Sequence, residues 1–223
     1  MNNRNSCKDP MEVLGRSKGY SQKELIKNLP RHYKYNSNLL NQIKNTPEVI
    51  LRNLGSPIAK KVDKMLKEIF AEAYRAKQFT RTEINNKSVL FGVVLLKHKV
   101  MDLVLDYFHK RWPQCIICLY NEHTQLTGII NEKGITQEIK QSLKEVVKKI
   151  SRKRQISPYF EDIQFSNDEI FETLYQSQNI KERKNTRYFN SMIPKHCFKL
   201  PGMRKGVEKR FTSKNKKIEE YFK

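Results

Sequence analysis

The chain has 223 residues, which suits one domain of ordinary size, or one domain with tails, and leaves little room for two. No run approaches the roughly 20 apolar residues of a membrane span, and the first residues lack the apolar core of a secretion signal. Four cysteines are too few for a disulfide scaffold in a chain of this length. We therefore expect no membrane association and a reducing, intracellular compartment: cytoplasmic and associated with the nucleoid, or nuclear in a eukaryotic cell.

The charge balance is strongly positive, because 44 Lys and Arg outnumber 23 Asp and Glu and give a formal net charge of +21. Such a surplus attracts polyanions, and each phosphate that is neutralised releases condensed counterions. Nucleic acid is therefore the expected partner. Two alternatives stay open: association with anionic lipid or the ribosome, and a compositional bias towards Lys, Asn and Ile that serves no binding role.

The first of three expected segments, residues 1–45, is polar and basic and partly helical. Short helices are expected around residues 21–28 and 38–43. Ser21 and Glu24 have the spacing of a capping box, in which each side chain bonds the backbone N–H of the other residue.

The central segment, residues 46–202, carries the periodic patterns of a folded domain. Apolar residues at three- and four-residue spacing predict a helix over residues 57–78. A short Val-rich apolar run predicts a buried strand over residues 88–96. A second helix is expected over residues 100–111, ended by Pro113, because proline disfavours helical geometry in the residue before it.

A hairpin is expected next, with β-prone runs over residues 115–120 and 126–130 on either side of a polar turn. Residues 137–150 have the apolar spacing of an amphipathic helix, and further helices are expected over residues 167–177 and 182–192. Three strands with four or more helices predict an α+β fold. Its small central sheet, of about three or more strands, has helices packed on it.

Cysteine and histidine give little sign of a metal site. Cys115 and Cys118 lie three residues apart in a predicted strand, where their side chains point to opposite faces, so two core cysteines are expected. The five histidines show no HxxxH or HExxH spacing and are expected at the surface or at caps. His98 differs, because it lies where a strand gives way to a helix, a place that often points into a cleft. No metal and no cofactor of its own is expected for the chain.

The charged stretch from Glu72 to Glu83 is a candidate for DNA contact. Arg75 and Arg81, with Lys77, are the candidates to bind phosphate, because the guanidinium fork matches phosphate oxygens. Ordinary solvated salt links are the simpler explanation of the same stretch.

A second candidate lies at the end of the helix over residues 100–111, where aromatic and basic residues alternate. Lys110 and Arg111 would neutralise phosphate, while Phe108 and Trp112 would stack on bases. Core packing of the two rings is the alternative.

Three motifs, in chain order, resemble those of one known family. They are Glu72-Ala-Tyr-Arg75 with Phe79-Thr-Arg81, then His98 with Tyr107-Phe108 and Arg111-x-Pro113, then Leu174-Tyr175, Ile180-x-Glu-Arg183-x-Asn185, Met192-x-Pro194-Lys195, Phe198 and Leu200-Pro201. Over about residues 50–202 the chain resembles the domain of unknown function 4130 family, described as probable DNA metabolism proteins. Tyr74 stands where that family has a histidine, and Gly202 where it has a glutamate.

The resemblance implies a context of DNA repair or DNA modification, without a known reaction. Members of the family typically accompany a radical-SAM protein thought to act on DNA, and some are fused to a uracil-DNA-glycosylase-like domain. A radical-SAM enzyme is therefore an expected partner, and it would supply the iron–sulfur cluster, since this chain has no CxxxCxxC motif. The third motif adds Arg183 and Asn185 to the residues expected to contact DNA, beside Arg75, Arg81, His98, Lys110 and Arg111.

The last segment, residues 203–223, is a basic tail that is expected to be flexible. Asn215, Ile218, Tyr221 and Phe222 resemble the clamp-interacting peptide of archaeal and eukaryotic DNA-repair enzymes, with Asn in place of Gln. The tail is therefore expected to dock on a sliding clamp. In the alternative, its apolar residues fold back onto the domain's own core, because burying them is favourable.

The sequence thus predicts a DNA-binding accessory factor of DNA repair or base modification. An enzyme that acts on damaged bases, of the glycosylase or nuclease type, is one alternative, with His98 and either Glu72 or Glu83 as acid–base groups. An RNA-binding or ribosome-associated protein is another.

Overall fold

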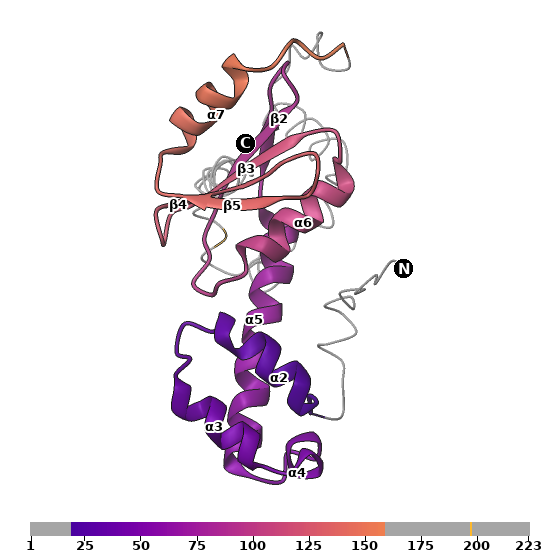
Figure 1. Cartoon of the computed structure of the whole chain (residues 1–223), viewed down its shortest axis with the longest axis vertical. Helices are drawn as coiled ribbons and strands as arrows, with labels where there is room; N and C mark the ends of the chain where they lie inside the picture. The colour runs from indigo at the N-terminus through magenta and orange to yellow at the C-terminus, as the bar shows by residue number, and fades with distance from the viewer. Residues whose placement is uncertain (1–18, 159–196, 198–223) are drawn as a thin grey trace, which may run out of the picture. The chain divides into compact units, whose positions relative to one another are not determined.

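A computed structural model describes residues 19–158 and Cys197 (Figure 1). The chain divides into two compact units. The first, called here the helical unit, comprises residues 1–78 and 96–108, and the second, the sheet unit, comprises residues 79–95 and 109–223.

The helical unit contains the four expected helices, close to their expected positions, and two short ones that were not expected. The expected helices are α2 (Gln22–Asn28), α3 (Ser37–Asn45), α5 (Pro57–Phe79) and α6 (Met101–Arg111), of which α5 and α6 continue slightly beyond the unit. The two that were not expected are the 3₁₀-helix η1 (Leu29–Arg31) and α4 (Glu48–Arg52). The capping box at the start of α2 is confirmed, with Ser21 and Glu24 exchanging hydrogen bonds. Leu66 and Ile69 of α5 are fully buried, as the apolar spacing predicts.

The sheet unit contains a five-stranded mixed sheet in the order β1-β2-β3-β4-β5. The strands are β1 (Thr82–Ile84), β2 (Val89–Val94), β3 (Ile116–Asn121), β4 (Leu126–Ile130) and β5 (Thr136–Ile139). The pair β2–β3 is parallel and the other three pairs are antiparallel. Parallel neighbours need a long connection, and the chain between β2 and β3 contains α6.

Helix α7 (Leu143–Arg152) packs on β2 and β3, as its position in Figure 1 shows. Val146 of α7 is buried with Val89 of β2 and Cys118 of β3, and further apolar side chains surround these three. The apolar side of α7 therefore closes one core of the sheet unit, and its polar side is left outward.

Two strands depart from the expectation. Residues 137–139 were expected at the start of a helix, but they belong to β5, where Gln137 pairs with Ile129. The helix begins only after Ser142, whose hydroxyl caps it in a capping box with Glu145, and that Ser-x-x-Glu spacing was a readable signal. The short edge strand β1 was not expected, because three residues give too little alternation to recognise.

The α+β class is confirmed. The helices expected over residues 167–177 and 182–192 and the tail over residues 203–223 lie outside the described residues, and the segment boundaries at residues 45 and 202 stay predictions. Among the described residues, no helix has the length and apolar character that crossing a membrane requires.

Candidate functional site

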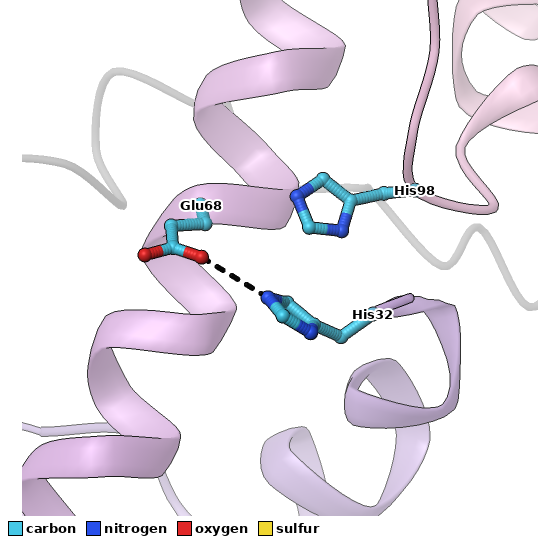
Figure 2. Close-up of side chains that lie close together, drawn as sticks. All are labelled: His32, Glu68 and His98. Carbon is cyan, nitrogen blue, oxygen red and sulfur yellow. Dashed lines mark hydrogen bonds and ion pairs between the residues drawn. The ribbon is translucent and has the colours of Figure 1, made fainter. Parts of the chain in front are cut away.

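Three titratable side chains from distant parts of the sequence meet in the helical unit (Figure 2). His32 follows η1, Glu68 lies in α5, and His98 precedes α6. One side-chain nitrogen or oxygen of each lies within 4.8 Å of those of the other two. His32 and His98 are only 3% and 8% exposed, whereas the Glu68 side chain is 44% exposed. This group is called the histidine cluster below.

The hydrogen bonds of His32 identify which ring nitrogen carries the proton. The backbone N–H of Lys34 donates to His32 Nδ1 at 3.1 Å, so Nδ1 is an acceptor. The proton of the neutral ring is then on Nε2, which lies 3.1 Å from Glu68 Oε2 and donates to it. This hydrogen bond is the main reason that the pKa of Glu68 lies below its ordinary value. Glu68 is therefore ionised at neutral pH.

The ring of His98 lies against that of His32, with centroids 4.5 Å apart and an interplanar angle of 46°. The pKa of His98 is lowered to about 4, mainly by burial and next by His32, with smaller contributions from the charges of Arg75 and Lys97, while Glu68 opposes them. His98 is therefore a neutral imidazole at neutral pH. Its Nδ1 atom is buried and has no hydrogen bond in the part of the chain that the structure describes.

The backbone on both sides of His98 is fixed by Glu72. One carboxylate oxygen accepts the N–H of Lys97 at 3.1 Å, and the other accepts the N–H of His98 at 2.8 Å. Glu68 and Glu72 lie one turn apart in α5, so the same face of that helix holds the backbone of His98 and supplies a carboxylate to the cluster.

The segment that carries His32 is fixed to the start of α6. The backbone N–H of Lys99 donates to the carbonyl of Arg31 at 2.8 Å. The Arg31 guanidinium in turn pairs with the Asp102 carboxylate through both of its terminal nitrogens, at 2.5 and 2.8 Å. A guanidinium and a carboxylate that pair through two hydrogen bonds fix each other's orientation and also stabilise the contact. The backbone next to both histidines is thus fixed by contacts of neighbouring residues, in addition to the ring contacts of His32.

Of the residues predicted from sequence, His98, Glu72 and Arg75 lie at this site. Arg75 is one turn further along α5, close enough for its charge to act on His98, and its buried Nε has no hydrogen bond among the described residues. His32 and Glu68 were missed. His32 was expected at the surface and is buried instead, because the residues that cover it are far away in the sequence.

The other predicted contacts either do not belong to the helical unit or lie outside the described residues. Arg81 and the exposed Glu83 belong to the sheet unit, as do Lys110 and Arg111, which are exposed at the end of α6. Arg183, Asn185, Asn215, Ile218, Tyr221 and Phe222 all lie outside the described residues.

The two aromatic residues beside Lys110 and Arg111 differ in their environment. Phe108 is 6% exposed and belongs to the core, which confirms the packing alternative for that ring. Trp112 is 40% exposed, so its ring is available to stack on a base.

The polar side of α7 presents a row of positive charge. Lys144, Lys148 and Arg152 recur every four residues, so they line one side of the helix over about 12 Å. All three are exposed, and none forms an ion pair within residues 19–158. Lys149 and Lys153 add charge beside them. Lys144, Lys148 and Arg152 are called the α7 row below.

Cys115 and Cys118 are core residues, as expected. Both are buried, with 1% and 0% exposure. Burial raises the pKa of the Cys118 thiol to about 12 and also raises that of Cys115. Neither is a thiolate at neutral pH, so the pair has the character of apolar core rather than of a redox or metal site.

Comparison with known protein families matches residues 30–200 to the domain of unknown function 4130 family. The same chain matches no curated protein and no solved structure. The match covers well over half of the 223 residues and includes His32, Glu68, His98 and α7. The chain therefore belongs to the domain of unknown function 4130 family.

Proposed function

We propose that the protein binds DNA as an accessory factor of DNA repair or base modification. The observation that carries this proposal is the α7 row. Like charges four residues apart destabilise a helix by a few tenths of a kcal/mol per pair, and the α7 row contains two such pairs, which bound anions would relieve. A line of phosphates would remove that repulsion and release counterions.

The row would hold the DNA backbone rather than read its sequence. Lys144, Lys148 and Arg152 suit phosphate oxygens, and no Asn or Gln lies in the row to read an adenine edge. A row of about 12 Å runs beside about seven charges of a duplex, which carries one charge per roughly 1.7 Å. Binding should therefore be steeply salt-dependent and nearly independent of sequence.

Two protein partners complete the proposal. The resemblance of the three motifs supports a radical-SAM enzyme as the catalytic partner. The order of Asn215, Ile218, Tyr221 and Phe222 supports a sliding clamp as the docking partner. Titrating a peptide of residues 205–223 against the clamp of the host tests the second partner. Unchanged affinity after Tyr221 and Phe222 are both replaced by Ala would end that part of the proposal.

The DNA proposal is tested by measuring the affinity of the full chain for duplex DNA, single-stranded DNA and RNA over a range of salt. Replacing Lys144, Lys148 and Arg152 by Ala should lower the slope of log affinity against log salt by up to about 2.7, at about 0.9 per phosphate contact. The control replaces three exposed lysines of α5, Lys60, Lys61 and Lys64, and removes the same charge. Equal slopes for the two triple variants would contradict the role of α7, and a preference for RNA would favour the RNA-binding alternative.

The histidine cluster favours a second candidate, an enzyme that acts on damaged bases. A neutral buried His98 beside an ionised Glu68 is the kind of arrangement that active sites use. Oligonucleotides with defined lesions distinguish the two candidates. An accessory factor leaves them intact, whereas an enzyme cuts them or releases a base and loses that activity, but not its DNA affinity, when His98→Gln is introduced.

A further inference from the structure

We propose that His32, Glu68 and His98 form a binding site for a divalent transition-metal ion. Two imidazole nitrogens and one carboxylate oxygen are a ligand set that zinc and its neighbours in the first transition row accept. The inference does not depend on DNA binding, because all three ligands belong to the helical unit and the α7 row belongs to the sheet unit.

The distances are close to those that an ion needs. Bonds from zinc to imidazole or carboxylate are about 2.0 to 2.2 Å, so the donor atoms of one ion lie at most about 4.4 Å apart. His32 Nε2 and Glu68 Oε2 are already 3.1 Å apart, and all three donor atoms fall within 4.8 Å. A movement of about 1 Å would close the cluster around an ion.

The protonation and exposure of the ligands also suit an ion. Glu68 supplies the negative charge and is half-exposed, so an ion can enter from its side. His98 is neutral, as a ligand must be, and its orphaned Nδ1 shows that the hydrogen bonds of the described chain do not satisfy this ring. Three protein ligands leave a coordination position for water or a substrate oxygen, as in catalytic zinc sites.

One hydrogen bond must change when the ion binds. His32 Nε2 now carries a proton, and coordination of the neutral imidazole through Nε2 requires that the ring carry its proton on Nδ1 instead. Nδ1 can then no longer accept the Lys34 N–H, and that bond breaks. Lys34 is exposed, so its released N–H can bond to water. Release of the Lys34 amide is therefore a specific sign of metal binding.

The test is a titration of the chelator-treated full chain with Zn²⁺ and Co²⁺, followed by calorimetry and visible absorption. One equivalent should bind, and Glu68→Gln and His98→Gln should each weaken binding at least tenfold. Glu48→Gln and His123→Gln, at an exposed helix residue and an exposed turn residue, are the matched controls and should bind like the parent protein. Amide exchange at Lys34 should speed up when Zn²⁺ is added.

Three results would overturn the inference. One is the absence of a stoichiometric complex, and another is equal affinity in Glu68→Gln and in both controls. The third is intense sulfur-to-cobalt absorption, which would place the ion on cysteines. Glu68→Gln changes a half-exposed side chain without changing its size, so circular dichroism should show that this variant keeps the parent fold. The metal affinities of Glu68→Gln and of the controls can then be compared even if His98→Gln fails to fold.

Discussion

Glu72 holds His98 by its backbone and not by its ring, with Glu72 Oε2 2.8 Å from the His98 nitrogen. Its second oxygen accepts the N–H of Lys97 at 3.1 Å. Both oxygens of this motif glutamate are therefore occupied by backbone donors. Each oxygen thereby fixes one peptide group next to the His98 ring, so the geometry assigns Glu72 a positioning role.

Glu72→Ala is expected to lower the free energy of unfolding by about 1 to 3 kcal/mol, because it leaves the partly buried His98 N–H without its acceptor and removes the exposed bond to the Lys97 N–H. Urea unfolding measures this change. The control is Glu48→Ala, which removes a pair with Arg52 in which both side chains are about half exposed, and which should change stability by less than about 1 kcal/mol. Similar losses in the two variants would show that Glu72 does not hold this segment.

Stability should fall between about pH 6.5 and pH 4, because His98 is protonated more easily in the unfolded chain than in the folded one. Its folded pKa is lowered from 6.5 to about 4, so its contribution is complete above pH 6.5 and is lost as the pH falls through this window. The full loss is about 3 kcal/mol, at 1.36 kcal/mol per pKa unit. Glu68, whose pKa is also lowered, adds a loss only below its ordinary value of 4.5.

Urea unfolding at a series of pH values checks this window. His98→Gln should flatten the dependence of stability on pH above about 4.5, because it removes the buried imidazole. His123→Gln changes an exposed histidine in a turn and should leave the dependence as it is. An unaltered pH profile in His98→Gln would contradict the assignment of this pH dependence to His98.

The elements with long or distinctive patterns could be predicted from sequence. Helix α5 was expected within one residue of its observed end, because 23 residues repeat an apolar spacing that only a helix satisfies. Strand β5 could not be predicted, because its four residues are mostly exposed. They resemble the polar first turn of a helix, and a helix, α7, does follow them in the sequence. The pairing of β5 depends on β4, which is a tertiary interaction and leaves no local pattern.

The candidate site could be predicted only in part, because it too depends on tertiary contacts. His98 stood out because it lies between a strand and a helix, and Glu72 because it belongs to a motif. His32 and Glu68 carry no such sign: they are 36 residues apart and meet only when α5 packs beside the turn after η1. A site assembled from three segments becomes visible once packing has placed them.

The thiol of Cys118 is expected to resist alkylation in the folded protein, because its pKa of about 12 leaves almost no thiolate at neutral pH. Mass spectrometry after brief treatment with iodoacetamide measures the modification. The same reagent in urea should label Cys118 fully, which supplies the control. Rapid labelling of Cys118 under native conditions would contradict its place in the core between β2 and α7.

Gly92 has no room for a side chain, because a Cβ atom there would lie 2.5 Å from the carbonyl oxygen of Arg81. Gly92→Ala should therefore lower stability by about 1 to 3 kcal/mol, since backbone on the neighbouring strand must move. Gly55→Ala is the matched control, because its nearest neighbour would lie at an ordinary 3.7 Å.

The effect of Gly92→Ala should be strongest at β1. That strand is only three residues long and lies at the edge of the sheet, so it can detach from β2 and relieve the clash while β2 stays paired with β3. Amide exchange should accelerate at Thr82–Ile84 and stay slow at Ile117 and Leu119 in β3. Uniform acceleration through the whole sheet would show instead that β1 is required for the folding of the unit, and slow exchange at β1 would mean that the two strands are not packed this closely.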